Sequence, residues 1–121
     1  MKHLLNWIEI PVTDMKRAKK FYAAILGEEL HEMEMAPMKY ALFPSEDKFN
    51  SGALVQGEFH VPSQQGLVVY LNGGKDLNTI LSKVKKAGGT VVMEKMHLSK
   101  EAGFIGMFLD TEGNKIGLQN S

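Results

Sequence analysis

The residue best suited to acid–base chemistry is a carboxylate inside an apolar stretch near the N-terminus. Ile8, Ile10 and Val12 alternate with other residues, as on the buried face of a strand over residues 4–12, so Glu9 should point the opposite way. Desolvation moves a carboxyl group toward the range that a general acid or base needs. Glu9 is therefore the candidate general base. A structural carboxylate, paired with a backbone amide, a Tyr or a Lys, explains the same position and is the commoner role.

Other side chains on the same predicted face could bind an organic ligand. Trp7 could stack on a planar ligand and Tyr70 offers a hydroxyl group, although core packing would explain either residue. Methionine adapts to varied apolar ligands, and Met107 is included among the expected ligand contacts. Gln119 shares this face but lies near the C-terminus, where solvation is the simpler interpretation.

Histidine spacing gives no metal motif. No two of the four histidines have His-x-His or i, i+4 spacing: His3, His31, His60 and His97. His60 falls in a polar linker and His97 in an expected loop over residues 94–103, so either could overhang the rim of a site, although a surface position is simpler. The least poor alternative metal cluster joins His97 with Glu94 or Glu101.

Composition sets the class of protein. The 121 residues suit one domain, and 44% hydrophobic with 23% charged residues is typical of a globular chain. A formal net charge of zero predicts no nucleic-acid partner and permits self-association. Without cysteine there can be no disulfide, thiol catalysis or Cys-bound zinc. No apolar run is long enough for a membrane span, and the N-terminus carries no signal-peptide core, so no membrane partner and a cytoplasmic location are expected.

Local signals predict the elements that position these side chains. Asp14 caps a helix that ends at Gly27, and its apolar stripe consists of Ala18, Phe21, Tyr22, Ile25 and Leu26. Asp76 caps a second helix, which ends at Gly88-Gly89. Strands are predicted at residues 4–12, 28–35, 38–43, 51–57, 67–72, 90–93, 104–109 and 115–119.

The order β-α-β-β-β therefore occurs twice. Asp14 and Asp76 are matching caps, and Gly27 and Gly89 are matching stops at the same offset. We interpret this as one domain over residues 1–121 made of two modules, at about 1–60 and about 66–121. Each helix must cover one sheet face. The expected fold is α+β: two tandem βαβββ modules forming a cup-shaped mixed sheet with the helices on the outside.

The motifs in these elements resemble a known family. Residues 8–22 are similar to a strand followed by V-x-D-x-x-R-A-x-x-F-Y, and residues 26–27 to the L-G that follows. Residues 108–116 resemble a closing F-x-D-P-x-G-N-x-I, with Thr111 where Pro is frequent, and residues 86–89 resemble the end of the second helix. These motifs are those of the vicinal oxygen chelate superfamily of glyoxalases, bleomycin resistance proteins and extradiol dioxygenases. The resemblance is strongest to its uncharacterised, glyoxalase-related branch.

The resemblance implies metal-ligand positions that this chain does not fill. In the superfamily's metalloenzymes the first and last strands of each module supply the ligands. Carried over, these positions fall on Trp7, Val68, Gly117 and near Val55, and none of these side chains can hold a divalent ion. No cofactor is therefore expected, although a divalent metal at other ligands stays open. Glyoxalase I and dioxygenase activities are not expected, and the resemblance to metal-free members implies binding of molecules such as antibiotics.

Three functions follow. The preferred one is binding of a small organic molecule in a metal-independent cup. The expected ligand contacts are Trp7, Glu9, Val55, Val68, Tyr70, Met107, Gly117 and Gln119. The alternatives are an isomerase or lyase that uses Glu9 as base, with or without a metal at non-standard ligands, and a ligand-sensing module. A homodimer is expected, with the cup formed within one chain or across two.

Overall fold

The computed structural model describes residues 5–35, 37–46 and 51–120. Within these ranges the elements are β1 (Ile8–Pro11), α1 (Met15–Leu26), β2 (His31–Met35), β3 (Met38–Leu42), β4 (Gly52–Gln56), β5 (Val69–Asn72), α2 (Asn78–Ala87), β6 (Thr90–Ser99), β7 (Gly103–Leu109) and β8 (Lys115–Gln119). The order β-α-β-β-β occurs twice, which confirms the predicted α+β fold of paired βαβββ modules.

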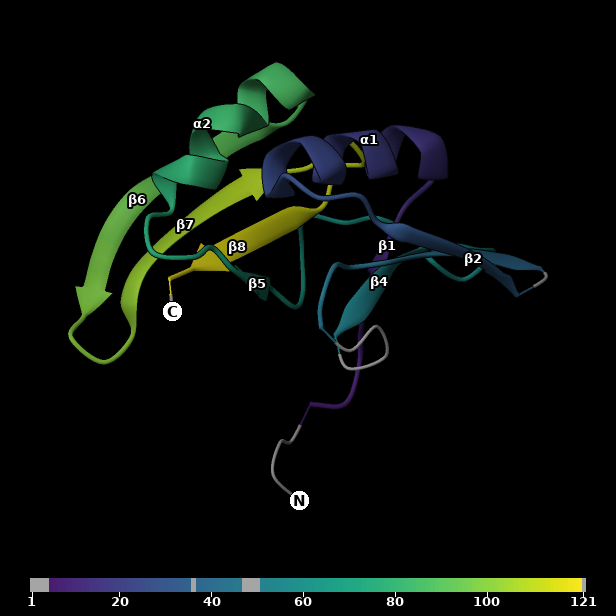
Figure 1. The fold of residues 1–121 in the computed structure, drawn as a ribbon, viewed down its shortest axis with the longest axis horizontal. Helices are drawn as coiled ribbons and strands as arrows, with labels where there is room; N and C mark the ends of the chain where they lie inside the picture. The colour runs from purple at the N-terminus through teal and green to yellow at the C-terminus, as the bar shows by residue number, and fades with distance from the viewer. Residues whose placement is uncertain (1–4, 36, 47–50, 121) are drawn as a thin grey trace.

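Each module builds its own mixed sheet of four strands, in the orders β1-β4-β3-β2 and β5-β8-β7-β6 (Figure 1). The first strand of each module pairs in parallel with the last, and the other pairs are antiparallel. The expected single mixed sheet is thus two separate four-stranded sheets. β1 and β5 are edge strands of these sheets and do not pack against each other.

Both helices form where their local signals predict them. Asp14 adopts an extended conformation and its carboxylate accepts a hydrogen bond from the Arg17 backbone N–H, as an N-cap does. Gly27, at φ 76°, ends α1 in the left-handed conformation that glycine adopts without strain. In α2 the matching stop is Gly88, at φ 110°, and not Gly89. The N-cap of α2 is Leu77, without a side-chain cap, and not the predicted Asp76; the Asp76 carboxylate still accepts a hydrogen bond from the Asn78 backbone N–H at 3.0 Å.

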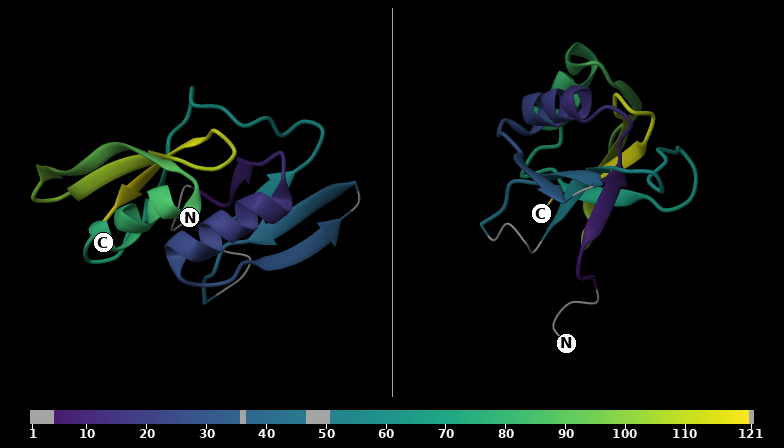
Figure 2. Two further views of the ribbon diagram at one scale, coloured as in Figure 1. Left: turned by 90° about the horizontal axis from the view of Figure 1, so that it is seen from above. Right: turned by 90° about the vertical axis from the view of Figure 1, so that its right-hand side faces the viewer.

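One core joins the two modules. α1 and α2 lie side by side on the same side of both sheets (Figures 1 and 2). The rings of Phe21, Tyr22 and Phe108 meet beneath them, with centroids 5.0 to 6.4 Å apart. The predicted helix-facing strand residues Ile10, Val12, Ile116 and Leu118 are buried in this core. The opposite sheet faces are consequently left free of helices.

The two stretches that resemble family motifs contact each other across the module boundary. The Tyr22 hydroxyl donates to Asp110 Oδ2 at 2.7 Å, and burial together with this carboxylate raises the pKa of Tyr22. The side-chain amide of Asn114 donates to the same carboxylate and to the carbonyl oxygen of Pro11, at the end of β1. The side-chain oxygen of Asn114, Oδ1, accepts a hydrogen bond from the Ser63 backbone N–H. β1 and the segment between the modules are therefore both attached to the β7–β8 turn.

Glu112, in the same turn, accepts hydrogen bonds at the N-terminus of α1. Its side chain is fully buried and bonds to the backbone N–H groups of Thr13 and Asp14 and to the Arg17 guanidinium at 2.7 Å. Burial alone would raise the pKa of Glu112, but these hydrogen bonds outweigh it and lower the pKa to about 2. A carboxylate of the second module thus binds the N-terminal end of α1, the helix of the first module.

Two sequence-based predictions need correction. The expected loop over residues 94–103 is mostly strand, because β6 continues to Ser99 before a tight turn. Register shifts interrupt the pairing of β6 with β7 at three places, and such bulges destroy the alternation by which a strand is recognised. Leu67, expected in a strand against a helix, is 96% exposed and precedes β5. Its backbone belongs to the linker between the modules, which we define as residues 57–68.

Candidate functional site

A hollow of about 720 Å³ lies between β1 and β5, the first strands of the two modules. We call it the intersheet hollow. Trp7, Glu9 and Pro11 line it from the first module, and Val68 and Tyr70 line it from the second. Residues predicted to face the helices reach it as well, so it lies between the two strand edges and not on one sheet face: Ile8, Ile10, Val69 and Ile116. The linker borders it through Val61, Ser63, Gln65 and Leu67. Four of the predicted ligand contacts are therefore brought together: Trp7, Glu9, Val68 and Tyr70.

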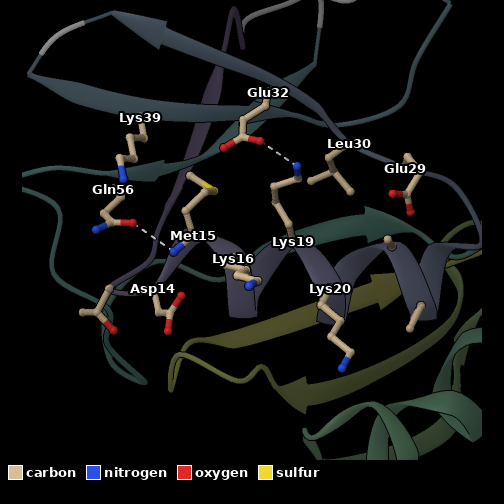
Figure 3. Close-up of a pocket in the computed structure, with 13 residues that line it drawn as sticks. Asp14, Met15, Lys16, Lys19, Lys20, Glu29, Leu30, Glu32, Lys39 and Gln56 are labelled. Atoms are coloured by element: carbon tan, nitrogen blue, oxygen red, sulfur yellow. Dashed lines mark hydrogen bonds and ion pairs between the residues drawn. The ribbon is translucent and has the colours of Figure 1, made fainter.

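A second hollow, of about 830 Å³, lies between α1 and β2, and Figure 3 shows its side chains. It is lined by lysines and carboxylates, including an ion pair in which Lys19 Nζ lies 2.8 Å from Glu32 Oε2. Gln56 accepts a hydrogen bond there from the Met15 backbone N–H at 2.9 Å. Flexible charged side chains on a surface are ordinarily solvated, and none of the predicted site residues lines this groove. The intersheet hollow is therefore the better candidate site.

Glu9 forms a compact polar group with two residues. Its Oε1 lies 2.7 Å from His60 Nε2, and its Oε2 accepts a hydrogen bond from the Trp7 indole N–H at 3.2 Å. The Glu9 side chain is 32% exposed, so it is not the desolvated carboxyl group that its apolar neighbours suggested. The paired-carboxylate alternative describes the geometry, with an imidazole and an indole as partners in place of an amide, Tyr or Lys. Neighbours along a strand do not bury a residue when that strand lies at a sheet edge.

A tight turn brings His60 to Glu9. The His60 backbone N–H donates to the carbonyl oxygen of Gly57 at 3.1 Å, which folds the start of the linker back over β1. Space is tight at this turn, because a Cβ on Gly57 would lie 2.9 Å from Met38 Cγ and 3.3 Å from His60 Nδ1, so a larger residue would displace the Met38 side chain. His60 thus does approach the site, as expected of a rim residue, but it holds Glu9 from the linker side.

Val55 has a different role from the one predicted. It is fully buried in a small cluster with Tyr40, Leu42 and Ala53 on the helix-free face of the first sheet. Trp7 packs against the edge of this cluster, so it both contributes to packing and lines the hollow. Because neighbouring side chains already cover this face, Val55 supports the floor under Trp7 and does not line the hollow.

Tyr70 covers Gly117 in the second sheet. The two residues are paired in register, and a Cβ on Gly117 would lie 2.5 Å from Tyr70 Cδ2. The ring therefore lies against the glycine backbone and occupies the space into which a longer side chain would project. Tyr70 is still 41% exposed, so it can contact a ligand. Gly117 contributes to the site indirectly, by making room for this ring.

The remaining predicted site residues lie outside the intersheet hollow. Met107, in β7, is paired with Gly117 of β8. The side-chain amide of Gln119 donates a hydrogen bond to the carbonyl oxygen of Ala102 at 2.9 Å. His97 is corrected from a rim residue in a loop to an exposed residue of β6, where its ring packs edge-on against Phe104. Phe104 contacts the helix-covered core, so His97, which is its partner across the strands, lies on the helix side of the second sheet. His3 lies outside the described residues.

The residues present do not fit the divalent metal of the family's metalloenzymes. The expected ligand positions hold an indole, two aliphatic side chains and a glycine covered by a tyrosine ring, none of which donates electrons to a divalent ion. In the described ranges 5–35, 37–46 and 51–120, no group of three or more His, Asp or Glu side chains could hold a metal ion. Glu9 and His60 are only two such groups.

Comparisons with known proteins agree with this fold. The model of the Glyoxalase/Bleomycin resistance protein/Dioxygenase superfamily matches residues 4–118. A glyoxylase-like domain-containing protein of Didymella fabae is 30% identical over 115 residues, which cover 91% of this chain and 88% of that protein. Glyoxalase I from Zea mays is 21% identical with a TM-score of 0.67, over 96% of this chain but only 45% of the maize chain.

A further similar structure is TnmS3, an antibiotic binding protein from Streptomyces sp. CB03234, which is 21% identical with a TM-score of 0.63 over 99% of this chain and 96% of that one. The structural matches establish the fold, and the family model and the relative from Didymella fabae establish the family. The chain belongs to the glyoxalase/bleomycin resistance protein/dioxygenase superfamily.

Proposed function

We propose that this protein binds a small organic molecule in the intersheet hollow without using a metal ion. The observation that carries the proposal is a hollow of about 720 Å³ that both modules line with aromatic, apolar and a few polar side chains. Small-molecule sites are typically concave, mostly apolar and of roughly 300–1,000 Å³. The antibiotic-binding protein TnmS3, with the same fold, offers a precedent for binding.

The aromatic residues support a ligand with a flat apolar part. Trp7 and Tyr70 come from different modules and both line the hollow. Exposed aromatic rings present a large contact area at a small cost in conformational entropy, and they stack on planar groups. The positions where the family's metalloenzymes carry metal ligands hold no ligating side chain in this chain. This favours direct binding of the molecule over binding through a metal ion.

A thermal-shift screen followed by titration calorimetry tests this proposal. A panel of planar aromatic metabolites and antibiotics should contain compounds that raise the Tm of the purified protein. Tyr70→Ala should weaken binding of those compounds about tenfold, whereas Val92→Ala, on exposed β6, should not. Stoichiometric metal in the purified protein, lost together with ligand affinity on chelation, would contradict metal independence.

An isomerase or lyase with Glu9 as general base is the second candidate. The 2.7 Å contact between Glu9 and His60 favours it, because carboxylate–imidazole pairs commonly take part in proton transfer. Against it, both carboxylate oxygens already have hydrogen-bond partners, His60 Nε2 and the Trp7 indole N–H. Glu9→Gln would abolish any turnover of a compound found in the screen, while a binding protein would show no turnover to lose.

We propose that the protein forms a homodimer around the mouth of the hollow. Leu5, Val61 and Leu67 line the hollow and are 71%, 73% and 96% exposed, and Phe59, two residues before Val61 in the linker, is 89% exposed. A group of large exposed apolar side chains is typical of an interface. Light scattering should give twice the chain mass, and Leu67→Glu with Phe59→Glu should yield a folded monomer. A monomeric wild type at micromolar concentration would refute this.

Neither described helix is long and apolar enough to span a bilayer.

A further inference from the structure

We infer that the ligand of the intersheet hollow is zwitterionic, with a protonated amine that contacts Glu9 and an anionic group that contacts Lys115. This inference rests on the proposed binding function and specifies its ligand class. Of the described residues that line the hollow, only Glu9 and Lys115 carry a full charge. They have opposite signs and come from different modules.

The two charges lie on opposite sides of the intersheet hollow. Glu9 is in β1, at the edge of the first sheet, and Lys115 begins β8 in the second. Lys115 lies two residues before Gly117 in β8, so both residues face the same side of the sheet. This is the side that carries the Tyr70 ring, because Tyr70 is paired with Gly117. A ligand that spans the hollow between the modules would therefore have one end near each charge and its body near the aromatic rings.

Glu9 is held in place by two neighbours and still has room for a ligand. Its Oε1 lies 2.7 Å from His60 Nε2, and its Oε2 accepts from the Trp7 indole N–H at 3.2 Å. These two contacts orient the carboxylate. Each carboxylate oxygen can accept more than one hydrogen bond, so lone pairs remain for a further donor.

Lys115 is likewise available. It is half-buried, and its ammonium group forms no ion pair with any residue in the described part of the chain. Two of the uncharged polar residues nearby are already engaged: Asn114 bonds to Asp110, Pro11 and the Ser63 backbone, and the Ser63 hydroxyl bonds to the Gln65 backbone. The Tyr70 hydroxyl and the Gln65 side chain offer uncharged polar contacts, while recognition of charge in the hollow depends on one anion and one cation. A ligand with a single charge would satisfy one of them and leave the other unpaired.

Matched probes test this inference directly. The zwitterion 4-(aminomethyl)benzoate, the cation benzylamine and the anion benzoate share one aromatic body and differ only in their charged ends. Each is titrated in one-ring and biphenyl forms, to allow for the span of the hollow, and Kd is measured by calorimetry and ligand-observed NMR. The zwitterion of at least one length should bind about tenfold more tightly than either singly charged probe.

Two variants assign the ends of the ligand. Glu9→Gln should reduce the affinity of the zwitterion to that of the anion, and Lys115→Met should reduce it to that of the cation. The matched controls Glu94→Gln and Lys85→Met change equal charges on exposed residues outside the hollow and should leave all Kd values unchanged.

The outcomes separate the ligand class from the proposed function. Equal binding of the three probes, tighter binding of a singly charged probe, or insensitivity to both hollow variants would overturn the zwitterion. Failure of all probes, while neutral compounds from the screen still bind and depend on Tyr70, would also overturn it but leave the binding function intact. If no compound of the screen or the probe set binds, both proposals fail.

Discussion

Replacing Glu112 by glutamine would remove one negative charge from a buried position where six hydrogen bonds converge. The carboxylate accepts from two backbone N–H groups at the start of α1, from the hydroxyls of Thr13 and Thr111, and twice from the Arg17 guanidinium. Glutamine keeps the shape, but it offers one acceptor oxygen in place of two. Its NH₂ group would face donors, which leaves hydrogen bonds unmade in a buried place.

The size of the effect follows from the pKa. The Glu112 pKa is about 2 in the folded protein and 4.5 in a free side chain, a difference equivalent to about 3 kcal/mol of folding free energy. Because the folded-state pKa is the lower one, this stabilisation is complete above pH 4.5 and is lost as the pH falls toward 2. The Glu112→Gln variant should therefore be less stable by about 3 kcal/mol at pH 7, and the deficit should shrink steadily in acid.

Urea denaturation followed by circular dichroism, repeated from pH 7 to pH 2.5, measures this difference. Glu94→Gln is the matched control, since Glu94 is exposed on β6, and its unfolding free energy should follow the wild type throughout. The reasoning would be refuted if Glu112→Gln unfolded within about 0.5 kcal/mol of the wild type at pH 7. A large deficit that does not change with pH would refute the assignment to the charge.

Three further predictions concern the module boundary and the site. Tyr22→Phe should lower the unfolding free energy by about 2 kcal/mol in urea titrations, because Asp110 loses a buried donor; no loss would contradict the role of that contact. Gly117→Ala should cost about 1–3 kcal/mol by overpacking, and adding Tyr70→Ala should recover most of that cost in a double-mutant cycle; simple additivity would count against the ring contact. His60→Gln should speed limited proteolysis within the linker, and an unchanged cleavage rate would show that His60 does not hold it.

Much of the fold could be predicted because its signals are local. The stripe of α1, its Asp14 cap and its Gly27 stop lie within fourteen residues and act wherever the helix is placed. The same holds for the alternation in β1 and β8, and hence for which sheet face meets the helices. Only the first four residues of β6 could be predicted, because its bulges break the period that defines a strand. That Trp7, Glu9, Val68 and Tyr70 lie near one another was predictable from side-chain alternation in the two matching segments, whereas Val55 was misplaced because burial depends on neighbouring strands.

By itself, then, the sequence determined the repeated βαβββ order, the helix ends, the helix-facing side of the strands and the family motifs, since each depends on residues close together in the chain. Only the tertiary structure decided that Glu9 pairs with His60, fifty-one residues away, and that Glu112 caps a helix of the other module. It likewise placed the Tyr70 ring on Gly117. Such contacts join segments whose separation in space is set by the packing of two modules on one core, and no local pattern of residues encodes that distance.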